Sequence, residues 1–268
     1  MSIDGGVITI EAASDIMESE DMLVINGGTI KGTSQDEGLE SKNSLYINGG
    51  DISIAAEDDG INAASYIEIN GGTLSIECNR GDAIDCNGGY DECIVINGGD
   101  IYAKGSTSPE GAIDADNSSV LINGGNLIAI GDSNSPISEN GEQATIVYGS
   151  FTADELIEIK DESGNTIYEY TPKVSGNTLI LSMDGLEESA TYTIYAAGTE
   201  TQSFTVDSKV IEAGGSASGM QQGMGGGPRN GDGNFGKNGE SFDGQMPQRG
   251  QMQDRRQMPE LDSQDSTN

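Results

Sequence analysis

The chain has no tryptophan and no histidine, and only 12 of its 268 residues are Lys or Arg. Without histidine, His-based general acid–base chemistry and His metal sites are excluded, and without tryptophan there are no indole platforms for sugar rings. Asp and Glu together number 45, so the formal charge is −33. This charge argues against nucleic acid or an anionic membrane as a partner and favours divalent cations.

Long apolar runs and cysteines are also scarce. No run approaches the ~20 apolar residues needed to span a bilayer, so we expect no membrane insertion. The three cysteines are Cys78, Cys86 and Cys93, and their spacing fits neither a zinc motif nor a dense disulfide framework. We expect small buried core residues, with a bridge between Cys86 and Cys93 as the alternative.

Glycine is abundant, and much of it lies in a repeated Ile-Asn-Gly-Gly motif. The first glycine of the motif is at positions 5, 27, 49, 71, 98 and 124, with Asp in place of Asn in the first copy. Apolar and polar residues alternate on both sides of the motif, as at 45–47 and 52–54, which indicates strands. Asn-Gly is expected to supply the positive φ of the turn between them.

The nearly constant return of about 22 residues favours a stacked coil over a hairpin meander, which has no reason to keep one period. A leucine-rich repeat does not fit, because residues 55–60 lack the leucine-bearing helical half. We therefore predict an all-β fold, a right-handed parallel β-helix over residues 1–144 with an incomplete first rung. Stacking the rungs predicts two apolar ladders and one amide ladder. The apolar ladders are Ile25, Ile47, Ile69, Ile96 and Ile122, and Ile8, Ile30, Ile52, Leu74, Ile101 and Leu127; the amide ladder is Asn26, Asn48, Asn70, Asn97 and Asn123.

A second motif, acidic and in most copies next to a glycine, lies between the strands of each repeat. When the copies are aligned on their apolar residue, one column contains Asp15, Glu37, Asp59 and Asp82. The other column contains Glu18, Glu40, Asn62, Asp85 and Asp114. Carboxylates one rung apart repel by ~1 kcal/mol in water and by ~3 to 4 kcal/mol at an effective dielectric near 20. Only four basic residues precede residue 145, too few to pair with these columns.

Two interpretations of the columns stay open. Calcium accepts six to eight oxygen ligands, so carboxylates such as Glu37, Glu40 and Asp114 are candidate metal ligands. Alternatively the columns form a solvated acidic rim whose repulsion is screened by salt.

Evidence for catalysis is thin. Lyases on β-helices abstract a sugar proton with Lys or Arg while calcium neutralises the uronate, which makes Arg80 the one candidate catalytic residue. Arg80 is equally expected to pair with neighbouring carboxylates. Four tyrosines are candidate stacking faces for sugar rings: Tyr46, Tyr66, Tyr90 and Tyr102.

After residue 144 the repeat ends and short alternating segments follow to residue 212. The turn residues at 162–165 and 183–185 are typical of β-hairpins, so we predict a small, sandwich-like antiparallel module that caps the coil. Residues 213–268 are rich in Gly, Met and Gln and are expected to form a disordered tail.

The repeated Ile-Asn-Gly-Gly with the intervening Asp58-Asp59-Gly60-Ile61-Asn62-Ala63 resembles a family of clostridial carbohydrate-binding β-helix proteins. The resemblance covers residues 3 to about 210 and extends to the tail. It implies a pectate-lyase-like fold, calcium binding and recognition of cellulosic or acidic polysaccharide. The calcium ligands it implies are chiefly Asp58, Asp59, Asp82 and Asp85.

We therefore expect a non-catalytic, monomeric, calcium-assisted polysaccharide-binding protein. The chain begins without a signal peptide and within a repeat, so we expect the intact protein to be longer and to be extracellular or at the cell surface. The alternatives are a calcium-dependent polysaccharide lyase and a structural or adhesive surface repeat protein.

Overall fold

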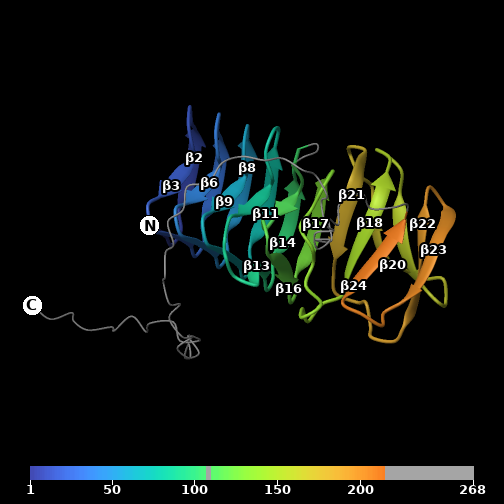
Figure 1. Cartoon of the computed structure of the whole chain (residues 1–268). Helices are drawn as coiled ribbons and strands as arrows, with labels where there is room; N and C mark the ends of the chain where they lie inside the picture. Colours follow the sequence, from blue (N-terminus) through green and yellow to red (C-terminus); the bar gives the residue numbers. More distant parts are fainter. Residues whose placement is uncertain (107–109, 215–268) are drawn as a thin grey trace, which may run out of the picture. The chain divides into compact units, whose positions relative to one another are not determined.

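A computed structural model describes residues 1–106 and 110–214 of the chain (Figure 1). Within these residues the regular secondary structure consists of strands alone. The predicted tail lies outside the described residues, except for its first two positions.

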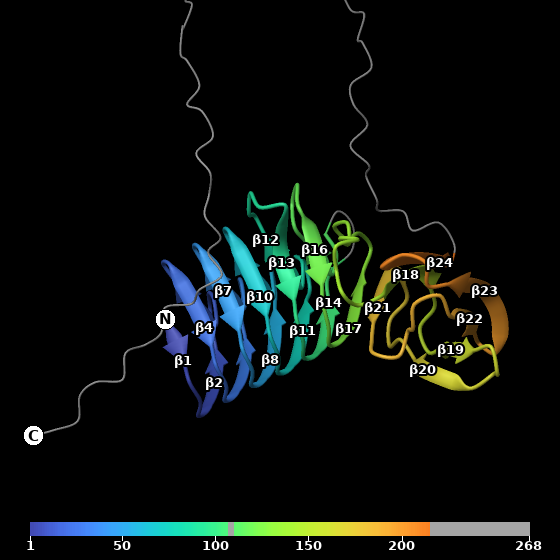
Figure 2. The same ribbon diagram turned by 90° about the horizontal axis from the view of Figure 1, so that it is seen from below.

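Each of the first five coils contributes one strand to each of three parallel stacks, and the last coil contributes to two of them (Figure 2). Sheet A holds the strands before the Asn-Gly-Gly turns: β1 (Ser2–Ile3), β4 (Met22–Ile25), β7 (Ser44–Ile47), β10 (Tyr66–Ile69), β13 (Glu92–Ile96) and β16 (Ser119–Ile122). Sheet B begins with those after the turns: β2 (Val7–Glu11), β5 (Thr29–Thr33), β8 (Asp51–Ala56), β11 (Thr73–Cys78), β14 (Asp100–Lys104) and β17 (Asn126–Gly131). Sheet C holds β3 (Met17–Ser19), β6 (Leu39–Ser41), β9 (Ile61–Ala63), β12 (Ile84–Cys86) and β15 (Ile113–Asp114). The predicted parallel β-helix is confirmed.

The strand register places the residues of each predicted ladder one above another. Ile25 pairs with Ile47 in sheet A, and Ile30 pairs with Ile52 in sheet B. All four side chains are buried in one continuous core inside the coil. Each such isoleucine removed from water stabilises the fold by roughly 1.5–3 kcal/mol, so the stacking itself forms the core.

The amide ladder is also confirmed. Asn48 donates from Nδ2 to Oδ1 of Asn26 at 2.7 Å, and Asn70 donates to Asn48 at 2.9 Å. Asn97 and Asn123 continue the chain of bonds, each at 2.8 Å.

The turns differ from the prediction in one detail. The positive φ belongs to the second glycine of each motif, such as Gly50 at 113° and Gly72 at 103°, and not to the Asn-Gly pair. A Cβ on Gly72 would also lie 2.8 Å from the carbonyl oxygen of Gly50, so close stacking of the turns requires glycine there as well.

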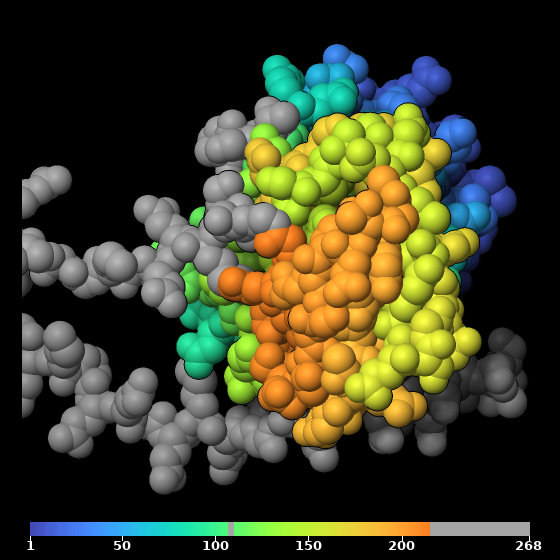
Figure 3. Space-filling model, turned by 90° about the vertical axis from the view of Figure 1, so that its right-hand side faces the viewer, coloured from blue at the N-terminus to red at the C-terminus, as the bar shows by residue number. Residues whose placement is uncertain are grey.

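After β17 the chain extends sheet B and adds a fourth sheet. Strands β21 (Gly176–Ser182), β18 (Thr145–Phe151) and β24 (Val210–Gly214) follow β17 in sheet B, with β21 antiparallel to both β17 and β18. Sheet D is antiparallel and contains β20 (Thr166–Tyr170), β19 (Ile157–Asp161), β22 (Thr191–Ala196) and β23 (Thr199–Thr205). These strands face the viewer in yellow and orange in Figure 3.

Strands β18 and β21 are buried on both faces. Val147 and Ile180 belong to the core of the coil, whereas Ile146 and Leu181 belong to a second core shared with sheet D. The turn at 162–165 joins the antiparallel pair β19 and β20, as predicted. The prediction of a hairpin at 183–185 is wrong, because β21 and β22, on either side of it, lie in different sheets.

Replacing Gly60 with alanine should destabilise the coil. A Cβ at Gly60 would lie 2.2 Å from Cγ2 of Ile76 and 2.6 Å from the carbonyl oxygen of Ala83. Overpacking of this kind costs about 1–3 kcal/mol of unfolding free energy. Urea denaturation measures the loss, with Gly89→Ala as the control because its Cβ would meet nothing within 4 Å. Equal midpoints for both variants would contradict the expectation.

Candidate functional site

Two stacked columns of acidic residues lie along sheet C and the turns that lead into it. In sheet C, Glu18 pairs with Glu40, Glu40 with Asn62, and Asn62 with Asp85. Asp85 in turn pairs with Asp114. The predicted alignment of this column is therefore confirmed, and its side chains stand one coil apart.

The column in the preceding turns is held by backbone hydrogen bonds between coils. The amide of Gly38 donates to the carbonyl of Asp59 at 2.8 Å, and the amide of Gly60 donates to that of Asp82 at 2.9 Å. Because the turns stack closely, the acidic side chains beside them are brought together across coils.

Among the described residues, three groups of carboxylates have ligand oxygens that lie within 4.8 Å of one another. We call them the inner cluster (Asp82, Asp85 and Asp114), the outer cluster (Asp15, Asp36 and Glu37) and the lysine-paired cluster (Asp15, Glu18 and Glu40). Oxygen-only sites of this kind suit hard cations such as calcium.

The inner cluster is the most buried of the three. Asp82 is 5% exposed and Asp85 is 9% exposed. One oxygen of each carboxylate accepts a hydrogen bond: from the amide of Gly111 to Asp82, from Asn87 to Asp85 at 2.7 Å, and from Ser135 to Asp114 at 2.8 Å. No ion pair to Lys or Arg reaches these carboxylates in the described part of the chain.

Burial opposes ionisation of the inner cluster. It raises the pKa of Asp82 to about 9, with further contributions from Glu110, Asp114 and Asp59. It raises the pKa of Asp85 to about 7, assisted by the charges of Asp59 and Asp114. At neutral pH the cluster therefore holds a proton or requires a cation.

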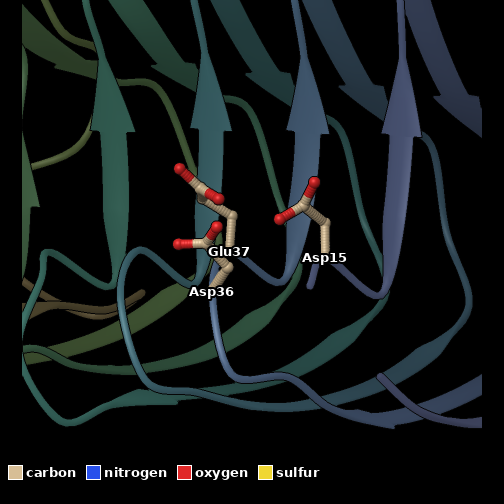
Figure 4. A group of neighbouring side chains, drawn as sticks. All are labelled: Asp15, Asp36 and Glu37. Atoms are coloured by element: carbon tan, nitrogen blue, oxygen red, sulfur yellow. The ribbon is translucent and has the colours of Figure 1, made fainter. Parts of the chain in front are cut away.

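The outer cluster joins two neighbouring coils, with Asp15 on one and Asp36 and Glu37 on the next (Figure 4). Oδ1 of Asp15 is buried and has no hydrogen-bond partner in the part of the chain that the structure describes. Burial, followed by contact with Asp15, raises the pKa of Glu37 to about 7. An unpartnered buried carboxylate oxygen beside two more carboxylates is what a bound cation would satisfy.

The lysine-paired cluster already contains its own cation. Nζ of Lys42 lies 3.2 Å from Glu18 and also contacts Glu40. A metal ion at this position would have to compete with the ammonium group, so this cluster is the weakest candidate of the three.

Asp58 and Asp59, proposed as ligands from the sequence, belong to none of the three clusters. Oδ1 of Asp59 accepts a hydrogen bond from the amide of Asp82 at 2.8 Å, and Oδ2 accepts one from Asn62 at 3.2 Å. Burial nevertheless raises the pKa of Asp59 to about 6. Its position supports the inner cluster through the backbone of Asp82.

The position of Arg80 does not support the lyase hypothesis. Its side chain is 68% exposed, and its Nε lies 3.8 Å from the carboxylate of Glu57 and 3.3 Å from the Glu57 carbonyl. Both of these contacts are made to Glu57.

Three of the four candidate tyrosines form a row along sheet A and the loop before β13. The ring centroids of Tyr46 and Tyr66 are 5.9 Å apart, as are those of Tyr66 and Tyr90. The hydroxyl of Tyr66 donates to Glu68 at 2.9 Å. Tyr102 lies elsewhere, half-buried against the core that sheet D shares.

The ligand set derived from the sequence omits Asp15, Asp36 and Glu18. The available signal was the Asp36-Glu37 pair, which occupies the same position in its repeat as Asp58-Asp59 in the next. Asp15 and Glu18 were placed in the acidic columns, but their proximity to Asp36 and Glu40 depends on side-chain direction.

No helix in the described residues is both long and apolar enough to cross a membrane.

Comparison with known proteins identifies one family. No curated protein and no solved structure matches the chain. A family described as "Carbohydrate-binding domain-containing protein" matches residues 32–217, more than half of the chain. The protein therefore belongs to this carbohydrate-binding domain family.

Proposed function

We propose that the protein is a non-catalytic, extracellular or cell-surface binder of acidic polysaccharide, and that calcium held by the carboxylate clusters assists binding. The observation that carries the proposal is the inner cluster, where three carboxylates converge with oxygens within 4.8 Å and no basic partner among the described residues. Family membership supports carbohydrate as the ligand class.

Calcium fits the donor set better than other common metals. Every candidate ligand atom in the clusters is a carboxylate oxygen, which excludes the nitrogen and sulfur donors that zinc prefers. Calcium accepts irregular sets of six to eight such ligands, whereas magnesium demands a near-ideal octahedron.

An acidic polysaccharide needs a cation on this protein. With a formal charge of −33, the bare surface repels uronate groups. A calcium ion in an acidic cluster neutralises most of its negative charge and can share its remaining coordination positions with a sugar carboxylate. The tyrosine row of Tyr46, Tyr66 and Tyr90 supplies apolar ring faces for the sugar rings.

Affinity electrophoresis through gels containing polygalacturonate, with calcium or with chelator, tests the proposal. We expect retardation with calcium and at least a tenfold weaker effect with chelator. A gel containing a neutral β-glucan is the matched control for the role of the sugar carboxylate. Equal mobility in every gel would contradict glycan binding and favour the structural repeat protein. Retardation that is unchanged by chelator would mean that the protein binds the glycan without the help of calcium.

A further inference from the structure

Cys86 and Cys93 face each other inside the coil, at the join between sheets C and A. Cys86 ends β12 and Cys93 lies in β13, and both side chains are fully buried. Sγ of each residue lies 3.4 Å from the carbonyl oxygen of the other. The two thiols also contact each other directly.

The coil that contains Cys86 and Cys93 is longer than the preceding coil, and the added residues lie between the two cysteines. Ala63 pairs with Cys86, yet Ile67 pairs with Ile94, so the segment between these pairs is four residues longer in the second coil. The preceding coils cross this corner without such a loop. The cysteines therefore mark the two ends of the insertion.

A local irregularity turns Cys93 inward. The register of β13 against β16 shifts between Glu92 and Ile94, which marks a bulge at Cys93. In the preceding coil Tyr66 stands before the paired isoleucine and is only partly buried, whereas Cys93 in the corresponding place is fully buried. Bulges re-aim side chains in this way, and here the result is a second thiol directed at the first.

We propose that Cys86 and Cys93 form a disulfide that closes the inserted loop, residues 87–92. Two thiols lose two protons and two electrons as the S–S bond forms, and a small-molecule disulfide accepts the electrons and protons to become two thiols. Exchange proceeds through a mixed disulfide on one cysteine, which the thiolate of the other then displaces.

The environment of the pair favours this exchange. Contact with Cys86 lowers the pKa of Cys93, which favours the thiolate that exchange requires. Cys78 is differently placed, because its thiol donates to the carbonyl of Gly81 at 2.9 Å and burial raises its pKa to about 12. The third cysteine therefore serves as an internal control.

The loop that the bridge would close carries two residues with contacts elsewhere. Tyr90 contacts Tyr66, and Glu92 accepts hydrogen bonds from Ser138 at 2.9 Å and from Asn140 at 2.8 Å. A closed loop has fewer unfolded conformations, so the bridge should stabilise the fold and hold Tyr90 beside Tyr66.

Refolding the full chain in a buffer of reduced and oxidised glutathione tests the proposal without relying on any sugar or metal. Free thiols are then counted with a chromogenic disulfide reagent in denaturant. We expect one free thiol, assigned to Cys78 by peptide mass spectrometry, together with a linked pair of peptides that contain Cys86 and Cys93. Reduction should restore three thiols and lower the melting temperature by several degrees.

The Cys78→Ser variant keeps the pair and should show no free thiol after the same refolding. Three free thiols in the wild-type chain, glutathione adducts on Cys86 or Cys93, or a bridge that includes Cys78 would each overturn the proposal. The thiol count and peptide masses come from the wild-type protein, so a variant that fails to fold leaves the test intact.

Discussion

Replacing Asp82 and Asp114 together by asparagine will lower calcium affinity on the order of a hundredfold, because it removes two of the three charges of the inner cluster. The substitutions are matched in shape. The amide of Gly111 still finds an oxygen at position 82, and Ser135 still finds one at position 114. The loss would therefore report charge at the site and not a broken hydrogen-bond network.

The same double variant should be more stable than the wild type when no metal is present. Neutral side chains remove the cost of burying charge at position 82, where burial is the largest cause of the raised pKa. Calcium should raise the melting temperature of the wild type and have little effect on the variant. Without metal the variant should melt at the higher temperature, and with calcium the wild type should. This reversal is the diagnostic result.

Calorimetric titration of calcium and thermal unfolding with chelator measure both effects. Asp51→Asn is the matched control, because Asp51 is exposed on β8 and belongs to none of the clusters. If the double variant binds calcium like the wild type, the inner cluster is not the site. The outer cluster would then be tested with Asp15→Asn and Glu37→Gln.

Much of the coil could be predicted from the sequence because the fold repeats. A stacked coil returns every residue to the position above its predecessor, so a column in the alignment is a ladder in space. Ile25 above Ile47 and Asn26 bonded to Asn48 follow from that rule alone. Even the acidic column from Glu18 to Asp114 was placed correctly.

The details of the candidate site depend on side-chain direction and on local irregularities of the strands. An alignment of the sequence repeats reveals neither. Asp59 and Asp82 share a column, yet the carboxylate of Asp59 accepts a hydrogen bond from the amide of Asp82 on the next coil, whereas that of Asp82 joins the inner cluster. The inward turn of Cys93 needs a bulge that only the pairing of β13 and β16 discloses. The turn at 183–185 was mistaken for a hairpin because a glycine turn signal does not reveal which sheet the next strand enters.

Raising the pH should destabilise the metal-free protein, which is the reverse of the usual behaviour of paired carboxylates. Burial raises the folded-state pKa of Glu37 and Asp85 to about 7, of Asp59 to about 6 and of Asp82 to about 9. Unfolded carboxyl groups titrate near pH ~4. Between these values the folded state binds more protons than the unfolded state, so unfolding releases protons and is favoured as pH increases.

The expected loss is about 3 kcal/mol of unfolding free energy between pH 5 and pH 9, because interacting carboxylates relax and share protons instead of contributing independently. For a domain of this size that corresponds to a fall of roughly 6–12 °C in melting temperature. The scans should be run in chelator at high ionic strength, which screens the general repulsion of the acidic surface and leaves the buried groups.

Saturating calcium should abolish this pH dependence or reverse it, since a metal ion binds only the ionised carboxylates and releases their protons. The melting temperature with calcium would then stay constant or rise from pH 5 to pH 9 while that of the metal-free protein falls. Asp82→Asn should flatten the metal-free curve most, because Asp82 has the highest pKa of the four groups. A metal-free melting temperature that rises across this range would mean that the carboxylates are ionised and solvated, and the acidic columns would then be a surface rim and not a cation site.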